Sequence, residues 1–282
     1  MTRAIWFGLA VVVGSGCGGE IKEACLPDQV ATPVAAVPHE SAGFHVFGHA
    51  HNDYEHARPL ADALDNKFYS VEADLWFDDG KLTVSHYGFG SKGTLQDLYL
   101  DPLQARVDAN GGSVHGDGVQ FTLWVDLKEN KAGLNEALHT LLNGYPMLTA
   151  IDGSTVTEGA VTIALTGDRT AKGAFVTDFP QRRAFRDSND YTPEDPAADS
   201  AWRFYALDWK KYLGWNGEGT LPEVDAARLG CIAENARADG RKLRFYSAPD
   251  KEAVWSTGLL YGVDFIHTDK LADLNGFFDS RQ

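Results

Sequence analysis

Short apolar runs alternate with segments of helical periodicity along most of this chain. The runs that we predict as strands cover residues 44–50, 68–77, 121–127, 161–166, 173–178, 203–208, 242–247 and 264–268. The segments that we predict as helices cover residues 57–66, 95–107, 133–142, 223–237 and 270–277. About eight strands that alternate with helices indicate an α/β fold, in which a parallel sheet closes into a TIM-type (β/α)8 barrel. The polar stretch 181–201 is predicted to be a loop.

The N-terminal part, residues 1–42, has neither the strand pattern nor the helical periodicity, and we expect it to lie outside the barrel. Residues 1–17 are typical of an export signal, because their apolar run 4–13 is shorter than the roughly 20 helical residues that span a bilayer. Their end resembles a bacterial lipobox, so we predict an exported bacterial lipoprotein, in the periplasm or at the outer membrane, with a lipid on Cys17. Secretion without the lipid is the alternative. Residues 18–42 are predicted to be a flexible tether, and residues 43–282 the single folded domain.

Composition and charge narrow the classes of partner. The chain has 282 residues, of which 44% are hydrophobic, and this suffices for one sizeable core. Its net charge of −15 makes it a poor nucleic-acid binder, and a phosphodiester would be repelled unless a bound cation inverted the local field. Besides Cys17, the sequence contains Cys25 and Cys231, which either form a disulfide or remain separate thiols. We expect a monomer.

Clusters of reactive side chains lie between residues 47 and 88. They comprise His49, His51 and Asn52 after the first predicted strand, Glu72 and Asp74 on the second, and His86. Side chains i and i+2 of a strand project to one face, so the histidine pair and the carboxylate pair would each share a face. The sequence Asp78-Asp79-Gly80 is typical of a tight turn, which would fold strand 81–86 back along the second strand. Two histidines and two carboxylates can therefore converge.

Two later strands carry further candidates. Asp126 and Lys128 share a face at the end of the third strand, and Tyr246 ends the seventh. Catalytic residues of such barrels lie at the C-terminal ends of the strands, where all of these residues fall. We expect His267 and Asp269, near the eighth strand, to be structural.

These motifs resemble a known superfamily. The run Ala50-His51-Asn52-Asp53-Tyr54 is similar to the Ser-His-Asn-Thr-Tyr run of phosphoinositide phospholipase C catalytic domains. Glu72-Ala-Asp74, followed by His86-Tyr-Gly88, resembles the metal-binding and second-histidine segments of that family, of glycerophosphodiester phosphodiesterases and of spider sphingomyelinase D. The overall sequence looks most like the branch named after altered inheritance of mitochondria protein 6, which has a similar His-x-His-Asn-Asp-Tyr start. The resemblance implies a phospholipase-C-like phosphodiesterase with a TIM-type barrel.

The resemblance also implies roles for the candidate residues. His51 and His86 would exchange protons with the substrate, and His49 would either support His51 or be the catalytic residue itself. Lys128 would contact the phosphate, and Tyr246 would border the pocket, although the family often has Trp-Thr where this chain has Tyr246-Ser. One divalent cation, Mg²⁺ or Ca²⁺, is implied, because its ligands would be hard oxygen atoms. These ligands would come from Asn52, Glu72, Asp74 and Asp126.

The expected substrate is a glycerophosphodiester, a phospholipid or a related small phosphodiester. The clusters contain no cysteine and no well-placed serine nucleophile, so we expect a substrate hydroxyl to attack the phosphorus and give a cyclic phosphate. Two alternatives remain. An amidohydrolase-like metallohydrolase would need further histidines on the middle strands, where the sequence has none. The other alternative is a catalytically inactive, surface-anchored binding barrel.

Overall fold

A parallel barrel forms the centre of the molecule. The computed structural model describes residues 25–26, 36 and 43–281, so the predicted signal and most of the predicted tether lie outside the described residues. Within the described part, eight parallel strands follow the order β12-β11-β10-β8-β5-β2-β1-β13. A parallel bridge between Arg244 and Phe265 joins the two ends of this order, so that the sheet closes on itself. The predicted α/β barrel is confirmed.

The strand bounds agree with most of the predicted runs. The barrel strands are β1 (Gly48–Ala50), β2 (Ser70–Asp78), β5 (Phe121–Leu127), β8 (Val161–Gly167), β10 (Ala184–Ser188), β11 (Trp202–Asp208), β12 (Lys242–Tyr246) and β13 (Ile266–Thr268). The short strands β3 (Lys81–Val84) and β4 (Gly93–Thr94) extend β2, and β6 (Ala150–Asp152), β7 (Thr155–Thr157) and β9 (Gln181–Arg182) form a small separate sheet. The β2–β3 hairpin has the predicted turn, because Asp79 and Gly80 both have positive φ angles, of 46° and 75°.

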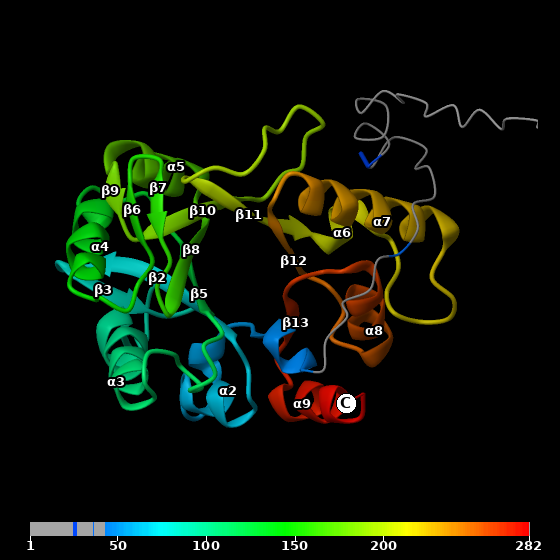
Figure 1. Ribbon diagram of the computed structural model, residues 1–282, viewed down its shortest axis with the longest axis horizontal. Coiled ribbons are helices and arrows are strands. Elements are labelled where there is room, and N and C mark those ends of the chain that lie inside the picture. The colour runs from blue at the N-terminus through cyan, green and yellow to red at the C-terminus, as the bar shows by residue number, and fades with distance from the viewer. Residues whose placement is uncertain (1–24, 27–35, 37–42, 282) are drawn as a thin grey trace, which may run out of the picture.

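Helices surround the barrel (Figure 1). They are α2 (Ala61–Asp65), α3 (Asp101–Ala109), α4 (Leu134–Asn143), α5 (Arg169–Asp178), α6 (Trp209–Tyr212), α7 (Glu223–Ala238), α8 (Glu252–Tyr261) and α9 (Leu271–Asp279). Shorter helical turns are η1 (Phe44–Phe47), η2 (Asp53–Glu55) and η3 (Gln96–Leu100). None of the helices in the described residues is long and apolar enough to span a membrane.

Two predictions between β8 and β11 are wrong. The run 173–178, predicted as a strand, belongs to α5, because the side chain of Asp168 caps this helix and Ala171 and Phe175 bury one of its faces. The stretch 181–201, predicted as a loop, contains β9 and β10. Between β10 and β11, the described chain has an irregular segment where the regular alternation would place a helix.

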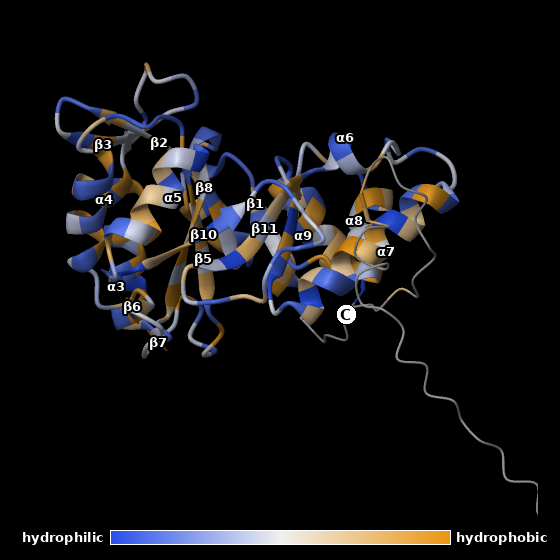
Figure 2. Ribbon diagram, turned by 90° about the horizontal axis from the view of Figure 1, so that it is seen from above, coloured by the Kyte–Doolittle hydropathy of each residue, from blue (hydrophilic) through white to orange (hydrophobic). Residues whose placement is uncertain are grey.

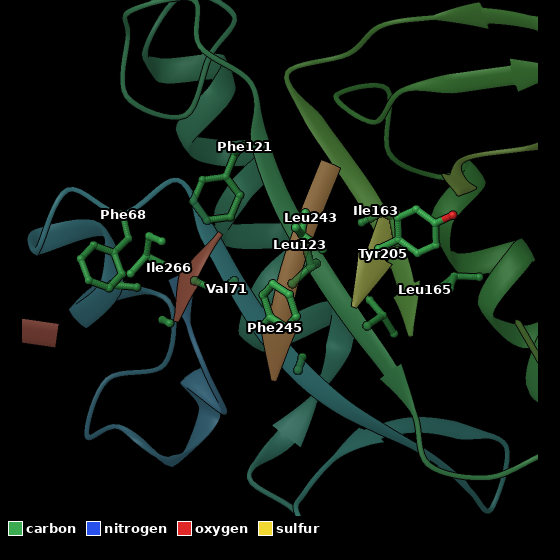
Figure 3. Packing of buried hydrophobic residues seen from close by; sticks show 14 of the residues in the cluster. Phe68, Val71, Phe121, Leu123, Ile163, Leu165, Tyr205, Leu243, Phe245 and Ile266 are labelled. Carbon is green, nitrogen blue, oxygen red and sulfur yellow. The ribbon is translucent and has the colours of Figure 1, made fainter. Parts of the chain in front are cut away.

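The core has one layer outside the barrel and one inside it. Outward-facing residues such as Val71, Leu123 and Leu243 pack toward the helices (Figure 3), and the strands are correspondingly apolar in Figure 2. Inside the barrel, the ring of Trp124 lies edge-on to that of Phe265 at 5.2 Å between centroids. This aromatic layer closes the barrel toward the N-terminal ends of its strands, and polar side chains occupy the layers toward the C-terminal ends.

A disulfide joins Cys25 to Cys231 of α7, across 206 positions of sequence. It fixes one point of the predicted tether against the folded domain. We expect the double variant Cys25→Ala/Cys231→Ala to lose about 2–5 kcal/mol of unfolding free energy, because an unlinked chain gains entropy when it unfolds. Urea unfolding measures this loss. A reductant should destabilise the unchanged chain and leave the double variant unaffected; equal unfolding midpoints for all samples would contradict the prediction.

Candidate functional site

A pocket of about 400 Å³ opens at the C-terminal ends of the barrel strands. Its wall contains seven predicted site residues, namely His51, Asn52, Glu72, His86, Asp126, Lys128 and Tyr246, together with Thr166, Gly167, Asn189 and Arg244. A larger cavity, of about 580 Å³, lies between α5 and β10, but it includes none of the predicted site residues. The predicted site residues therefore gather around the smaller pocket.

Strand register explains this convergence. Asp74 of β2 is paired with Asp126 of β5, which is paired in turn with Thr166 of β8. Two residues earlier on the same strands, Glu72 is paired with Trp124 and forms the next layer of the barrel. Because strand side chains alternate between faces, the residues of these two levels point into the barrel, one above the other.

His51 and His86 have a common arrangement. The Nδ1 atom of His51 lies 2.8 Å from Oδ1 of Asp269, and the Nδ1 atom of His86 lies 3.1 Å from the Tyr54 hydroxyl and 3.3 Å from Oδ2 of Asp74. The Tyr54 hydroxyl donates to Oδ1 of Asn52 at 3.1 Å. Each ring is thus oriented through Nδ1, and its Nε2 atom has no hydrogen bond to any described residue. Both Nε2 atoms are available to a ligand.

The charges around His51 favour its protonated form. Burial acts to lower the pKa of His51, but the hydrogen bond to Asp269 and the nearby charge of Glu72 outweigh burial and raise it. The same hydrogen bond lowers the pKa of Asp269. Asp269, expected to be structural, is therefore a direct partner of a predicted site residue.

His49 lies beneath the pocket and does not line it. Its Nδ1 atom is 2.8 Å from the Ser70 hydroxyl, and its Nε2 atom accepts a hydrogen bond from Nη1 of Arg244 at 2.7 Å. Burial and the Arg244 charge lower the pKa of His49 to about 3, so the imidazole is neutral. Both ring nitrogens are occupied, and this geometry supports the predicted role of a partner beneath His51 more than that of a group that touches substrate.

Arg244 is the main site residue that the sequence did not reveal. Its guanidinium donates from Nη2 to Oε1 of Glu72 at 2.6 Å and lies 4.4 Å from the ring centre of Trp124. Burial acts to raise the pKa of Glu72, but the charge of the adjacent Arg244 guanidinium holds it well below its usual value. The only sequence signal was that Arg244 shares a strand face with Tyr246.

A second ion-pair group forms the other side of the pocket. The Lys128 ammonium lies 2.9 Å from Oδ2 of Asp74 and 2.8 Å from Oδ2 of Asp126. The contact with Asp126 has hydrogen-bond geometry, whereas the contact with Asp74 is a charge contact only. Burial and the Asp126 charge raise the pKa of Asp74. Lys128 thus lies between two carboxylates of the predicted metal set.

The donors fit a hard divalent cation in their chemistry. Oε2 of Glu72, Oδ1 of Asp74 and Oδ1 of Asp126 are buried and accept no hydrogen bond. A bound cation would compensate these buried oxygens, which are costly to leave unpaired. In the described residues, however, no three His, Cys, Asp or Glu side chains are close enough to form a metal site. The Lys128 ammonium supplies the positive charge between Asp74 and Asp126 in this arrangement.

Gly167 makes room for Asp126. It has a φ angle of +83°, and an added Cβ atom would overlap Oδ1 of Asp126 and the carbonyl of Leu127. We expect Gly167→Ala to cost roughly 2–5 kcal/mol of unfolding free energy, because it combines a left-handed backbone with overpacking. Thermal or urea unfolding measures this cost. Gly173→Ala, in the open on α5, is the matched control and should gain about 0.5–1 kcal/mol; equal effects at both positions would refute the reasoning.

Comparisons with known proteins confirm the family that the sequence motifs resemble. The model of the AIM6-like phosphodiesterase domain family matches residues 42–187. Altered inheritance of mitochondria protein 6 from Lachancea thermotolerans is 28% identical over 276 residues, which cover 80% of this chain and 64% of that protein. The protein of the same name from Eremothecium gossypii is 24% identical over 268 residues, covering 81% and 68%. The chain therefore spans about two thirds of the length of these curated relatives.

Two solved structures resemble the barrel. A putative glycerophosphoryl diester phosphodiesterase from Silicibacter pomeroyi has a TM-score of 0.56 and 12% identity, covering 84% of this chain and 94% of that one. A glycerophosphodiester phosphodiesterase from Parabacteroides distasonis has a TM-score of 0.50 and 13% identity, covering 84% and 98%. At these identities, the similarity shows a shared fold.

The comparisons also correct the predicted location. The two curated relatives are yeast proteins named for the inheritance of mitochondria, and they point away from a bacterial lipoprotein. The predicted location, that of an exported bacterial lipoprotein, is therefore wrong. That prediction depended on a few residues, with Gly14 where a lipobox usually has Leu, and such a short match arises easily in any apolar N-terminus.

Proposed function

Because the chain belongs to the AIM6-like phosphodiesterase domain family, we propose that its barrel pocket hydrolyses a phosphodiester. The observation that carries this proposal is the paired orientation of His51 and His86. Each ring is held through Nδ1 by a neighbouring oxygen and leaves Nε2 for a ligand in the same pocket. Two imidazoles so placed suit a reaction that removes one proton and delivers another.

The side chains divide the work of the reaction. One histidine takes the proton of the attacking hydroxyl, and the other protonates the oxygen of the leaving alcohol. Lys128 donates hydrogen bonds to a phosphate oxygen, and Arg244 adds positive charge from below. No Cys or Ser among the described residues lines the pocket, so a substrate hydroxyl attacks the phosphorus in this proposal, and a cyclic phosphate is the first product. Phosphorus NMR on a hydroxyl-bearing diester tests this course, which fails if no cyclic product forms at any time.

We further propose that the pocket holds one Mg²⁺ or Ca²⁺ ion. Its ligands would be the unpaired carboxylate oxygens of Glu72, Asp74 and Asp126 and the side-chain oxygen of Asn52. These groups would have to move closer together than they lie in the described residues, and Lys128 would have to leave Asp74 and Asp126. A bound ion would stabilise negative charge on the phosphoryl oxygens as a Lewis acid.

Turnover of a soluble para-nitrophenyl phosphodiester whose other alcohol carries a hydroxyl next to the phosphate tests the proposed function. We expect activity with Mg²⁺ or Ca²⁺ and its loss with a chelator, whereas zinc should be a poor substitute because the donors are hard oxygens. The tested protein is the full chain. An absence of turnover under all of these conditions would refute the hydrolase and favour an inactive binding barrel.

Asp74→Asn tests the metal ligands. The amide keeps the shape of Asp74 but removes its charge, so we expect Mg²⁺ and Ca²⁺ to bind at least about tenfold more weakly in calorimetry. Asp79→Asn, at the exposed tip of the β2–β3 hairpin, makes the same chemical change away from the pocket and should bind as the unchanged chain does. Equal affinities for all three proteins would exclude Asp74 as a ligand.

A further inference from the structure

Two aromatic side chains project from the loop that follows β3. Tyr87 and Phe89 are 68% and 76% exposed, more than any other large apolar side chain in the described residues. Their rings stack on each other, with 5.9 Å between centroids and 21° between planes. Burial of such rings is normally a large gain in free energy, so a neighbouring exposed pair indicates a surface that something else covers.

This pair lies next to His86, which lines the proposed catalytic pocket. Tyr87 directly follows His86, and the two rings meet edge to face at 4.3 Å between centroids. The other exposed large apolar side chains in the described residues are single and lie apart, in the loop before β5 (Val119), on α7 (Val224) and on α8 (Leu260). The aromatic patch is therefore specific to the pocket mouth.

We propose that Tyr87 and Phe89 dock the mouth of the barrel onto a phospholipid bilayer, and that the substrate is the phosphodiester of a membrane lipid. The substrate part of this inference rests on the proposed function. Aromatic rings favour the headgroup level of a bilayer, where they bury apolar faces while a tyrosine hydroxyl stays hydrated. Lipid phosphodiesters lie at the same level, so a pocket beside the rings would meet them directly.

The charge of the chain decides which bilayer suits this surface. The net charge of −15 opposes binding to an anionic leaflet. Lys92, in the same loop, is paired with Glu55 at 3.0 Å and adds no surplus positive charge. Docking would therefore depend on apolar contact with a zwitterionic surface, and its strength should change little between low and high salt.

Flotation of the full chain with phosphatidylcholine vesicles tests the docking without any turnover. Because Tyr87 touches His86, the test changes Phe89. We expect Phe89→Ser to weaken vesicle partitioning about tenfold, from the loss of one buried aromatic ring, and Phe89→Trp to preserve it. Leu260→Ser removes an exposed apolar side chain of α8 and is the matched control, which should partition as the unchanged chain does.

Several outcomes would overturn the inference. The inference fails if the unchanged chain does not float with the vesicles, or if the Phe89→Ser variant floats equally well. It also fails if the patch instead joins two copies of the chain, which would be seen as a dimer that Phe89→Ser dissociates. The failure of the proposed function looks different, since a chain that floats but hydrolyses neither vesicle lipid nor the soluble diester keeps its docking surface and loses its assigned chemistry.

Discussion

Replacing His86 or His51 with alanine is expected to lower kcat on a phosphodiester by about 10²–10⁴, the usual contribution of a positioned acid or base. Each imidazole is oriented by a hydrogen-bonded partner at Nδ1, and its Nε2 atom faces the pocket. Loss of either ring removes one of the two proton transfers. Steady-state kinetics on the soluble diester measures the effect.

A surface histidine gives the matched control for this prediction. His139 of α4 stacks on Phe179 outside the barrel, so His139→Ala should leave kcat within about twofold. Circular dichroism should show that the His51 and His86 variants are folded. A folded His86→Ala variant that retained full kcat would remove His86 from the mechanism.

Replacing Arg244 with methionine is expected to lower the free energy of unfolding by about 3–5 kcal/mol, because a buried carboxylate loses its partner. Arg244 donates to Glu72 at 2.6 Å and to His49 at 2.7 Å in the barrel interior. The methionine fills much of the volume but donates no hydrogen bond. Urea unfolding measures the change.

A double-mutant cycle separates the buried charge from the packing. Adding Glu72→Gln to Arg244→Met removes the unpaired carboxylate, so the double variant should be more stable than the sum of the single effects predicts. Arg237→Met, at an exposed ion pair of α7, should change stability by less than about 0.5 kcal/mol. Strict additivity of the two barrel substitutions would mean that Arg244 does not compensate the Glu72 charge.

The period-two pattern of the strands was enough to predict most of the pocket. Asp74 and Asp126 could be assigned to the C-terminal ends of the second and third strands, and the register sets them side by side. His86 could be assigned as well, because the Asp79-Gly80 turn leaves the chain only one way to fold back. In each case, the strand pattern or the turn that determined the position of the side chain lies within a few residues of that side chain in the sequence.

The parts that the sequence did not reveal depend on long-range contacts. Nothing near Arg244 indicates that its partners are Glu72 and His49, because the closure of the barrel brings them together. Asp269 was expected to be structural for the same reason, since its bond to His51 spans 218 positions. Residues 173–178 were predicted as a strand because their apolar residues fit either period, and the cap at Asp168 decided the outcome.

The separation of the pocket residues along the chain also governs when the site can exist. The contacts between His49 and Arg244 and between His51 and Asp269 span 195 and 218 positions, so they form only after the last two strands have joined the first. During synthesis, a ribosome would have to release nearly the whole domain before these contacts could form. A nascent or truncated chain would carry His51 and Glu72 without Asp269, which orients His51, and without Arg244, which compensates the charge of Glu72. Such a chain would lack the proposed activity, which would appear only with the complete fold.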